Sequence, residues 1–454
     1  MIKSVNPSNN QLIKEYPEIE KGKLQFIISE SKKVFKDWSN TNFSFRTEIL
    51  KKVAKILIED KKRLAELMTL EMGKPILQSY AEVEKCAWVC EFYAENGEKF
   101  LSDEIIKTDF TKSYVTFQPL GIIFAIMPWN FPLWQVFRYA APTLMAGNTC
   151  ILKHASNVSG CAIAIEEIFL KAGLPQNVFN TILLSASRIE ELISHPDIQA
   201  ISLTGSVPAG SSVAALAGKY LKKTLLELGG SDPYIVLKDA DIKLAVETCV
   251  TSRLINGGQS CIAAKRFIVE EDIYNEFVDR FVSLMETKKM GDPFNQNNDL
   301  GPQASVKLRD ELHQQVIESI KRGAELKLGG FIPNVIGAFY PPTVLTNVLP
   351  GMPAFDEELF GPVASIIKAK DENDAIELAN NSIFGLGAAI FTSDLQKGEM
   401  IAKTKLNAGN CFVNAFVRSD PRLPFGGIKQ SGYGRELSIF GIREFVNIKT
   451  VVVK

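Results

Sequence analysis

The chain has 454 residues, and its content of 46% hydrophobic and 23% charged residues is typical of a folded globular protein, which excludes a disordered or collagen-like chain. The 51 Lys and Arg residues balance 52 Asp and Glu residues, so nucleic-acid binding is not expected. Only 3 histidines are present, at scattered positions, and we expect no metal site.

The N-terminal segment and the cysteines indicate the cellular compartment. Residues 1–16 contain neither the apolar core of a signal peptide nor the Arg and Ser richness of a transit peptide. No apolar stretch of ~18 residues is free of charge, Pro or Gly, so we expect no membrane span. The 7 cysteines are widely spaced and form no C-x-x-C pair, which is typical of a reducing compartment. We therefore expect a cytoplasmic protein.

The first long segment of the chain is predicted to be helical. Residues 21–101 are rich in Lys, Glu, Ala and Leu, and apolar residues recur at helical spacing, as at Ile49, Val53 and Ile56. The run Met72–Pro75 contains Gly and Pro and predicts a break between two helices.

Residues 113–240 alternate between short apolar runs and helical patterns. The apolar runs predict strands over 122–126, 149–152, 181–184, 200–203, 224–228 and 234–237. The segments between them predict helices over 160–172, 189–195 and 209–220. This alternation is typical of βαβ units and a parallel sheet, in which ligands bind beyond the carboxyl ends of the strands.

A second α/β pattern covers about 230–430, with strands expected over 266–270, 360–367, 388–392 and 409–414. Two further strands, over 113–118 and within 444–453, have no obvious neighbour. Because an isolated strand needs a sheet to join, we expect these two to pair with other strands.

Cys261 is the cysteine that stands apart, because it follows a polar, Gly-rich loop, Asn256-Gly257-Gly258-Gln259-Ser260. A buried structural thiol is the usual role of a free cysteine, and it suits the other six, which lie in predicted helices or strands. On the loop alone, a reactive thiol and a structural thiol at Cys261 remain equally plausible. No histidine partner is evident, which argues against a papain-like protease.

Three other motifs place polar groups at predicted strand ends. Glu227, before Gly229 and Gly230, is either a strand-end acid in solvent or a buried general base with a raised pKa. Asn130 lies in the rigid turn Pro128–Pro132, as a structural cap or an oxyanion donor. Gly205 and Ser206 lie at a strand-to-helix junction, where backbone N–H groups attract phosphate, although Ser is also an ordinary helix cap.

Six motifs in this order resemble those of the aldehyde dehydrogenase superfamily over essentially the whole chain. They are PWNFP (128–132), LTGS (203–206), LELGG (226–230), NGGQSC (256–261), EELFGPV (357–363) and PFGGIKQSGYGRE (424–436). The longer stretches around them are most similar to the short bacterial succinate-semialdehyde dehydrogenases. The resemblance implies oxidation of an aldehyde, most specifically succinate semialdehyde to succinate, with NAD or NADP as cofactor.

The resemblance also implies the catalytic residues. Cys261 is expected to be the nucleophile that forms a thiohemiacetal and then a thioester. Asn130 and the backbone N–H of Cys261 are expected to bind the oxyanion, and Glu227 to act as the general base that activates water for hydrolysis of the thioester.

The cofactor residues implied in the same way are Trp129, Lys153, Ser156, Gly205, Ser206, Leu228, Glu358 and Phe360. Glu358 is expected to bind the nicotinamide ribose, and Lys153 and Ser156 to lie at the adenosine ribose. Many NAD-preferring relatives have Glu in place of Ser156, and its absence leaves room for the 2′-phosphate of NADP. Two departures from the family pattern lie at this end, namely His154 in place of the usual proline and a segment, 183–187, without the Gly-rich turn.

The substrate residues proposed from the sequence are Arg138, Gln135 and Ser419. Arg138 lies eight residues after Asn130 on the same predicted helix, a spacing that returns it to roughly the same face, and it matches the arginine that similar enzymes use for the substrate carboxylate. The alternative is a surface arginine paired with an acid. Arg253 and Arg422 are weaker candidates for a second cation.

The fold class expected from these observations is α/β, similar to that of aldehyde dehydrogenases. A Rossmann-like NAD(P)-binding domain is expected over 1–104 and 119–228, an α/β catalytic domain over 229–435, and a small β oligomerisation element over 105–118 and 436–454. In the family this element pairs with a partner subunit, so a homodimer or homotetramer is expected.

Alternative functions remain. The first is an aldehyde dehydrogenase for another ω-carboxy or small aliphatic aldehyde, and a CoA-acylating relative is less favoured because Glu227 is present. A non-catalytic binding protein on the same fold would be a different class, but the presence of both Cys261 and Glu227 argues against it.

Overall fold

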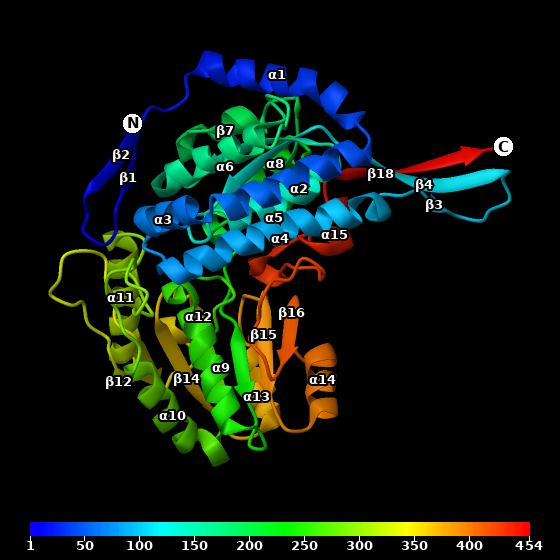
Figure 1. The fold of residues 1–454 in the computed structure, drawn as a ribbon. Coiled ribbons are helices and arrows are strands. Elements are labelled where there is room, and N and C mark those ends of the chain that lie inside the picture. The colour runs from blue at the N-terminus through cyan, green and yellow to red at the C-terminus, as the bar shows by residue number, and fades with distance from the viewer.

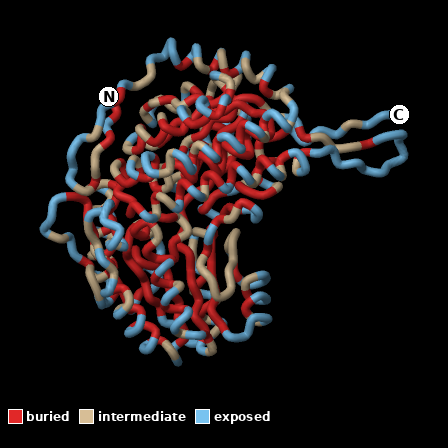
Figure 2. The backbone as a smooth tube through the Cα atoms, viewed as in Figure 1, coloured by how far each residue is buried: buried red, intermediate tan, exposed pale blue.

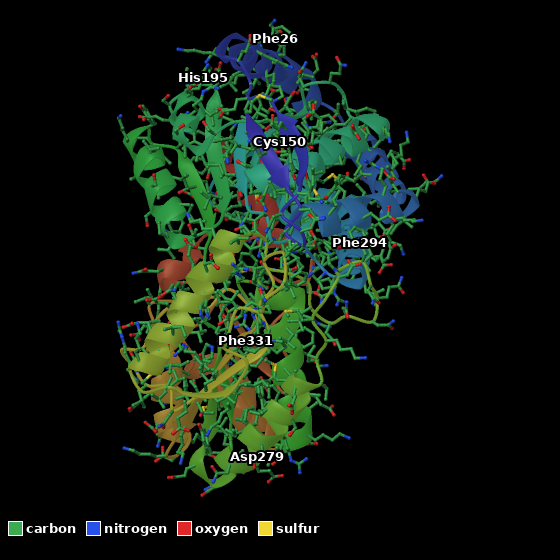
Figure 3. All side chains as sticks on the ribbon, turned by 90° about the vertical axis from the view of Figure 1, so that its left-hand side faces the viewer. Phe26, Cys150, His195, Asp279, Phe294 and Phe331 are labelled. Carbon is green, nitrogen blue, oxygen red and sulfur yellow. The ribbon has the colours of Figure 1, made fainter.

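The computed structural model describes residues 1–454, which form two lobes and a projecting arm (Figure 1). Each lobe is built on its own sheet, and a third, smaller sheet forms the arm. In Figure 3 Phe26 marks the outer end of the first lobe and Asp279 the opposite end of the molecule, with Cys150 inside the first lobe. None of the helices has the length and apolar character needed to cross a membrane.

The first lobe contains a six-stranded sheet. In spatial order its strands are β17 (Gly432–Tyr433), β9 (Lys223–Glu227), β8 (Ile198–Thr204), β5 (Ile122–Met127), β6 (Thr149–His154) and β7 (Phe179–Ile182). All pair in parallel except β17, which is antiparallel to β9. The parallel strands are therefore joined by crossovers, as expected for βαβ units.

Alternating side chains explain why this sheet is covered on both faces. Ile123 and Ala125 of β5 pack into one apolar cluster, whereas Ile122 and Phe124 pack into another on the opposite face. Because successive side chains of a strand point to opposite faces, an almost continuous apolar run requires helices on both sides. The helices of this lobe are α1 (Lys21–Ser39), α2 (Phe43–Glu59), α3 (Lys61–Met72), α4 (Ile76–Phe100), α5 (Trp134–Met145), α6 (Ser159–Lys171), α7 (Glu190–Ile193) and α8 (Val207–Lys219).

The second lobe is built on a seven-stranded sheet that also has apolar side chains on both faces. Its strands, in spatial order, are β12 (Glu325–Leu328), β13 (Thr343–Thr346), β14 (Val363–Ala369), β11 (Arg266–Glu270), β10 (Pro233–Val236), β15 (Gly387–Phe391) and β16 (Asn410–Val413). Tyr234 and Val236 of β10 face one apolar cluster and Ile235 faces the other. The helices are α9 (Ile242–Leu254), α10 (Glu271–Glu286), α11 (Val306–Lys321), α12 (Pro353–Asp356), α13 (Glu372–Asn380) and α14 (Leu395–Thr404).

The arm consists of β4 (Lys112–Pro119) between β18 (Val446–Val453) and the short β3 (Glu104–Ile105). It follows α15 (Ser438–Arg443) and projects away from both lobes, with the C-terminus near its tip (Figure 1). Most of the arm is exposed, in contrast to the buried sheets of the lobes (Figure 2). Its exposed apolar side chains include Ile105, Ile448, Val452 and Val453.

The predicted strands and helices are largely confirmed, with local shifts. The strand expected over 181–184 is β7, Phe179–Ile182, and the strand expected from 360 begins at Val363 because Gly361 and Pro362 precede it. The two strands expected over 113–118 and within 444–453 pair with each other, since β4 and β18 are antiparallel partners. The structure also contains strands that were not predicted, namely the N-terminal hairpin of β1 (Ile2–Val5) and β2 (Leu12–Tyr16) and the short strands β3, β12, β13 and β17.

Candidate active site

Strand direction brings the predicted motifs to one edge of the first sheet. Because β5, β6, β8 and β9 are parallel, the residues that follow them meet at their carboxyl ends. These residues include Asn130 after β5, Ser156 after β6, Ser206 after β8 and Gly229 after β9. The second lobe contributes the Cys261 loop to the same region.

The loop before Cys261 has a backbone that suits its glycines. Asn256, Gly257 and Gly258 all have positive φ, of 54°, 60° and 77°. A Cβ on Gly258 would lie 2.1 Å from the carbonyl oxygen of Gly361, so only glycine permits this contact between the NGGQSC and EELFGPV motifs. The buried Arg253 donates to the Gly258 carbonyl oxygen at 2.7 Å and braces the turn.

Lys265 and Glu358 hold the Cys261 loop against the end of β9. The Lys265 ammonium is fully buried and donates to the carbonyl oxygens of Ser260 (2.9 Å) and Cys261 (2.7 Å). It also lies 3.5 Å from the Glu358 carboxylate, which accepts from the Gly230 N–H at 3.0 Å. These contacts join three of the sequence motifs into one structure.

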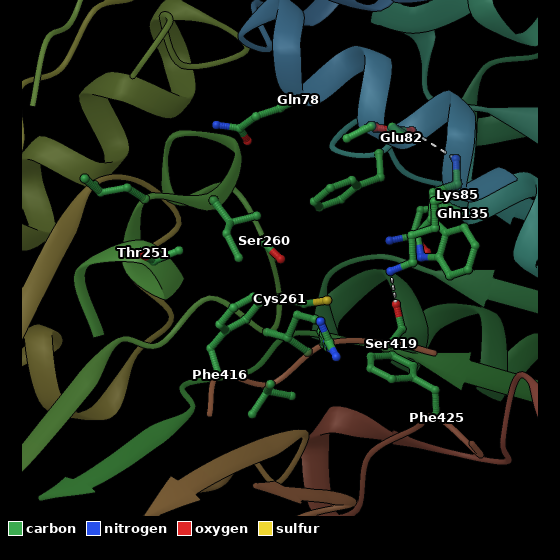
Figure 4. Close-up of a pocket in the computed structure, with 18 of the residues that line it drawn as sticks. Gln78, Glu82, Lys85, Gln135, Thr251, Ser260, Cys261, Phe416, Ser419 and Phe425 are labelled. Carbon is green, nitrogen blue, oxygen red and sulfur yellow. Dashed lines mark hydrogen bonds between the residues drawn. The ribbon is translucent and has the colours of Figure 1, made fainter. Parts of the chain in front are cut away.

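Cys261 lies in the wall of a cavity of about 520 Å³ between the lobes (Figure 4). Figure 4 shows the Lys85 ammonium, the Gln135 amide and the Ser419 hydroxyl on one side of the cavity, with the Cys261 thiol directed toward that side. The wall also contains the charged side chain of Arg138 and four aromatic side chains, those of Phe131, Trp134, Phe416 and Phe425. The cavity therefore combines a thiol, cations and an apolar lining.

The surroundings of the Cys261 thiol oppose its ionisation. Burial raises its pKa to about 12, although the positive charges of Arg138 and Lys265 act in the opposite direction. Cys86, Cys90, Cys150, Cys161 and Cys249 are fully enclosed in their helices and strands, whereas Cys261 and Cys411 are partly exposed. Of these two, only Cys261 lines the cavity.

Asn130 is positioned beside the Cys261 loop. Its side-chain amide nitrogen donates to the Gln259 carbonyl oxygen at 3.1 Å, and its backbone carbonyl oxygen accepts from the Asn256 side-chain amide at 2.7 Å. The amide retains a second N–H, and the backbone N–H of Cys261 has no protein acceptor. The two donors together can bind a negatively charged oxygen.

Glu227 is buried, at 2% exposure, and is not part of the cavity wall. Burial and the neighbouring Glu436 raise its pKa well above the usual range, while Arg138 and Arg435 oppose this shift. Neither of its carboxyl oxygens has a hydrogen-bond partner. A Cβ on Gly426 would lie 2.8 Å from one of them, so the PFGG motif leaves space for this side chain. The alternative of a solvent-facing Glu227 is therefore wrong.

The residues expected to bind the cofactor lie around the carboxyl edge of the first sheet. The Trp129 and Phe360 rings meet edge to face at 5.7 Å. Ser156 is exposed, and Ser206 is also exposed and caps α8, accepting from the Ala209 N–H at 3.5 Å. Leu228 fills the space beside Gly210, where a Cβ would lie 2.5 Å from it.

His154 has a structural role in this edge. Its Nδ1 accepts from the Ala155 N–H at 2.8 Å, so Nε2 carries the proton and donates to the Pro132 carbonyl oxygen at 2.8 Å. It thereby ties the end of β6 to the turn after β5. Lys153, the residue before it, is largely buried, and its ammonium contacts the His154 carbonyl oxygen at 3.3 Å.

Arg138, Gln135 and Ser419 all lie in the cavity wall. The helical spacing that was used to place Arg138 there does not hold. Asn130 and Arg138 were expected on one helix, and this prediction is wrong because α5 begins at Trp134 and Asn130 lies in the preceding turn. The buried Arg138 guanidinium forms an ion pair with Glu436 and lies over the Phe425 ring.

Arg253 and Arg422 do not line the cavity. Arg253 donates to the Gly258 carbonyl oxygen in the Cys261 loop, and the exposed Arg422 pairs with Asp420 at 2.6 Å. Three cations of the wall were not predicted from the sequence, namely Lys288, the exposed Arg418 and the partly buried Lys85 in the middle of α4. Nothing in the sequence near Lys85 distinguishes it from the other lysines of a Lys-rich helical segment, so only the tertiary packing of α4 reveals it.

This combination of two α/β lobes and a cysteine loop facing a parallel sheet defines a class. The sequence profile of the Aldehyde dehydrogenase family matches residues 1–451, and the chain therefore belongs to this family. Within it, the chain is 48% identical to the succinate semialdehyde dehydrogenase [NAD(P)+] Sad of Escherichia coli over 99% of this chain and 97% of that protein.

Two further relatives are similar over their full length. A probable succinate-semialdehyde dehydrogenase [NADP(+)] of Synechocystis is 46% identical, with 99% of both chains covered. The crystal structure of succinic semialdehyde dehydrogenase from Streptococcus pyogenes in complex with NADP+ is 36% identical, covers 100% of both chains and superposes with a TM-score of 0.98.

Proposed function

We propose that this protein oxidises succinate semialdehyde to succinate, with NADP or NAD as the hydride acceptor. The observation that carries the proposal is the cavity of about 520 Å³, whose wall contains both the Cys261 thiol and the cations Arg138 and Lys85. A thiol can react with the aldehyde end of a small substrate while a cation binds a carboxylate at the other end. The relatives named for this substrate support the same assignment.

In the proposed mechanism the Cys261 thiol first releases its proton to solvent, and the thiolate then attacks the aldehyde carbon. A C–S bond forms, and the former carbonyl oxygen becomes an oxyanion. The free N–H of the Asn130 amide and the backbone N–H of Cys261 stabilise this charge. Bound NADP or NAD supplies the acceptor for the hydride that leaves the same carbon, and a thioester remains on Cys261.

Glu227 is the proposed general base for hydrolysis of that thioester. Its buried carboxyl has no hydrogen-bond partner, and burial raises its pKa, which makes its carboxylate a stronger base than an exposed one. Because Glu227 lies outside the cavity wall, this role requires its side chain to rotate toward Cys261. The glycine at 426 leaves the space in which the carboxyl now lies.

The residues at the carboxyl edge of the first sheet fit a dinucleotide. Gly205 and the exposed Ser206 open α8, where backbone N–H groups favour a phosphate. Glu358 would accept from the nicotinamide ribose, with Trp129 and Phe360 beside it and Leu228 behind. Ser156 is small and exposed and lies three residues after Lys153. This arrangement leaves room for the 2′-phosphate of NADP, which a Glu at this position would repel.

The arm supports assembly of this protein into a homodimer or homotetramer. Strands β3 and β18 are the edges of a three-stranded sheet with exposed apolar side chains, and an open edge pairs readily with another chain. We also infer a cytoplasmic location, since the reaction needs a reduced Cys261 and all 7 cysteines are free.

The test is a set of initial rates for succinate semialdehyde, for a longer ω-carboxy aldehyde and for butanal, each with NADP and with NAD. We expect the highest kcat/KM for succinate semialdehyde with NADP. A higher value for the longer aldehyde would favour the other ω-carboxy assignment, and a higher value for butanal would overturn the carboxylate proposal.

A further inference from the structure

Lys85 enters the active-site cavity from a helix that carries none of the six motifs. It lies in the middle of α4, and its ammonium donates to the Ser419 hydroxyl at 2.8 Å (Figure 4). The ammonium also lies 4.3 Å from the centre of the buried Trp134 ring, an arrangement that attracts a cation. These two contacts fix the ammonium at the cavity wall and leave two of its three donors unused.

The other charges of the cavity wall, apart from the exposed Arg418, have partners. Arg138 pairs with Glu436, and Lys288 lies 3.9 Å from Asp299. Glu82 pairs with the buried Lys74 and also accepts from the backbone N–H groups of Leu133 and Trp134. The remaining cation, Arg418, has an exposed side chain. Lys85 is therefore the partly buried cation of this wall that has no carboxylate within ion-pair distance.

The charges that surround Lys85 leave its positive charge uncompensated. Asp420, the nearest acid on the facing loop, is already paired with Arg422 at 2.6 Å. Burial, together with the nearby Arg138 guanidinium, lowers the pKa of Lys85 to about 8, while Glu82, Cys86 and Asp420 act weakly in the other direction. An anion that enters the cavity would stabilise the charged form of Lys85, because it would supply the missing negative charge.

We propose that Lys85 is the residue that makes this cavity selective for an aldehyde with a carboxylate at its far end. The Lys85 ammonium binds the carboxylate directly, Ser419 orients the ammonium, and Arg138 shares its charge between Glu436 and the substrate. This inference rests on the proposed function and assigns its specificity to a residue outside the motifs. It explains how the cavity attracts an anion although its one buried arginine is already paired.

Two pairs of compounds that are similar in size but differ in charge test the assignment. The first is succinate semialdehyde and butanal, compared by the ratio of their kcat/KM values. The second is 4-iodobutyrate and 4-iodobutyramide, compared by the ratio of their rates of Cys261 alkylation, which does not depend on dehydrogenase activity. The variants are Lys85→Met, Lys85→Arg and, as a control, Lys99→Met, which removes an exposed charge from the same helix.

Lys85→Met should lower both ratios by about 30-fold or more, as expected for loss of one partner of a desolvated charge pair. Lys85→Arg should retain most of each ratio, and Lys99→Met should retain all of it. An unchanged alkylation ratio in Lys85→Met would overturn the assignment of Lys85. A lowered alkylation ratio in a protein that does not prefer succinate semialdehyde would support Lys85 as the anion-binding residue and instead overturn the proposed substrate.

Discussion

At the scale of single residues, the surroundings of Cys261 separate it from the other cysteines. Cys150 is buried in β6 within the first apolar cluster, whereas Cys261 lies on a strained loop that faces the cavity. Burial raises the pKa of both thiols to about 12, so position rather than acidity distinguishes them. The cavity position of Cys261 is therefore the feature that favours it as the nucleophile.

Replacement of the proposed nucleophile gives the first prediction. Cys261→Ala should lower kcat for aldehyde oxidation below detection while the circular dichroism spectrum and the melting temperature change little, because the side chain lines a cavity. Cys150→Ala should instead lower the melting temperature and keep activity at temperatures where it remains folded, since it removes a buried side chain. Activity in Cys261→Ala close to that of the wild type would show that another group attacks the aldehyde.

Ser156 gives the second prediction. Ser156→Glu should reduce kcat/KM with NADP by at least tenfold more than with NAD, since a carboxylate would face the 2′-phosphate. The measurement is the ratio of the two kcat/KM values. Ser102→Glu adds the same charge at an exposed site outside the cofactor sheet and should leave that ratio unchanged. Equal losses with both cofactors in Ser156→Glu would place the ribose elsewhere.

The sequence predicted the site residues that lie in or near motifs, but not the contacts that depend on tertiary packing. Asn130, Arg138, Gln135 and Ser419 were found because they lie in or near motifs, although the helical argument for Arg138 was wrong. Lys85 could not be found, since its role depends on how α4 packs against α5 and the loop at Ser419. Pairing of Arg138 with Glu436 likewise joins residues about 300 positions apart, which no local pattern encodes.

At the scale of secondary structure, strands with two buried faces were the most predictable elements. The runs that became β5, β6, β8 and β11 are apolar and bounded by polar or Gly-containing segments, so both their existence and their parallel pairing followed from the pattern. Among the missed strands, β3 and β17 have two residues each, β12 is exposed on most of its length, and β13 is buried but only four residues long. Such strands depend on their neighbours rather than on their own sequence.

The link between two strand ends through His154 gives a pH prediction. Burial lowers its pKa from 6.5 to about 4, so between these values the unfolded chain binds a proton that the folded protein does not. The stability contributed by the neutral His154 is thus complete above pH ~6.5 and is lost as the pH falls toward ~4, by ~3 kcal/mol in total.

The measurement is the free energy of unfolding in urea for the wild type and for His154→Gln across this pH range. Gln keeps one N–H donor for Pro132 but does not titrate. The advantage of the wild type over the variant should therefore shrink as the pH falls from 6.5 to 4. A difference that is independent of pH would show that His154 does not stay neutral in the folded protein.

At the scale of the whole molecule, the two lobes and the arm have separate tasks. The first lobe presents the sheet edge proposed to bind the cofactor, the second presents the Cys261 loop, and the cavity lies between them. The N-terminal hairpin also connects the lobes, since Ser4 donates to Glu71 and the Ala338 N–H donates to the Pro7 carbonyl oxygen. The boundaries 1–104, 119–228 and 229–435 remain predictions, and β17, from residues 432–433, joins the sheet of the first lobe.

The arm gives the prediction at this scale. A chain that ends after Phe445 lacks β18 and leaves β4 without its main partner. We expect this variant to form a smaller assembly than the full chain, measured by light scattering at equal protein concentration, because the exposed sheet edge is lost. An assembly of the same size would show that the subunits associate through another surface.

The most direct test of the whole account is to trap the covalent intermediate. Glu227→Gln should still form the thioester but hydrolyse it slowly, so mixing it with succinate semialdehyde and NADP should give a burst of NADPH equal to the active sites. Mass spectrometry of the digested protein should then find one succinyl group on the peptide that carries Cys261. A full burst with the succinyl group on a different residue, or rapid turnover with no trapped group, would contradict the account.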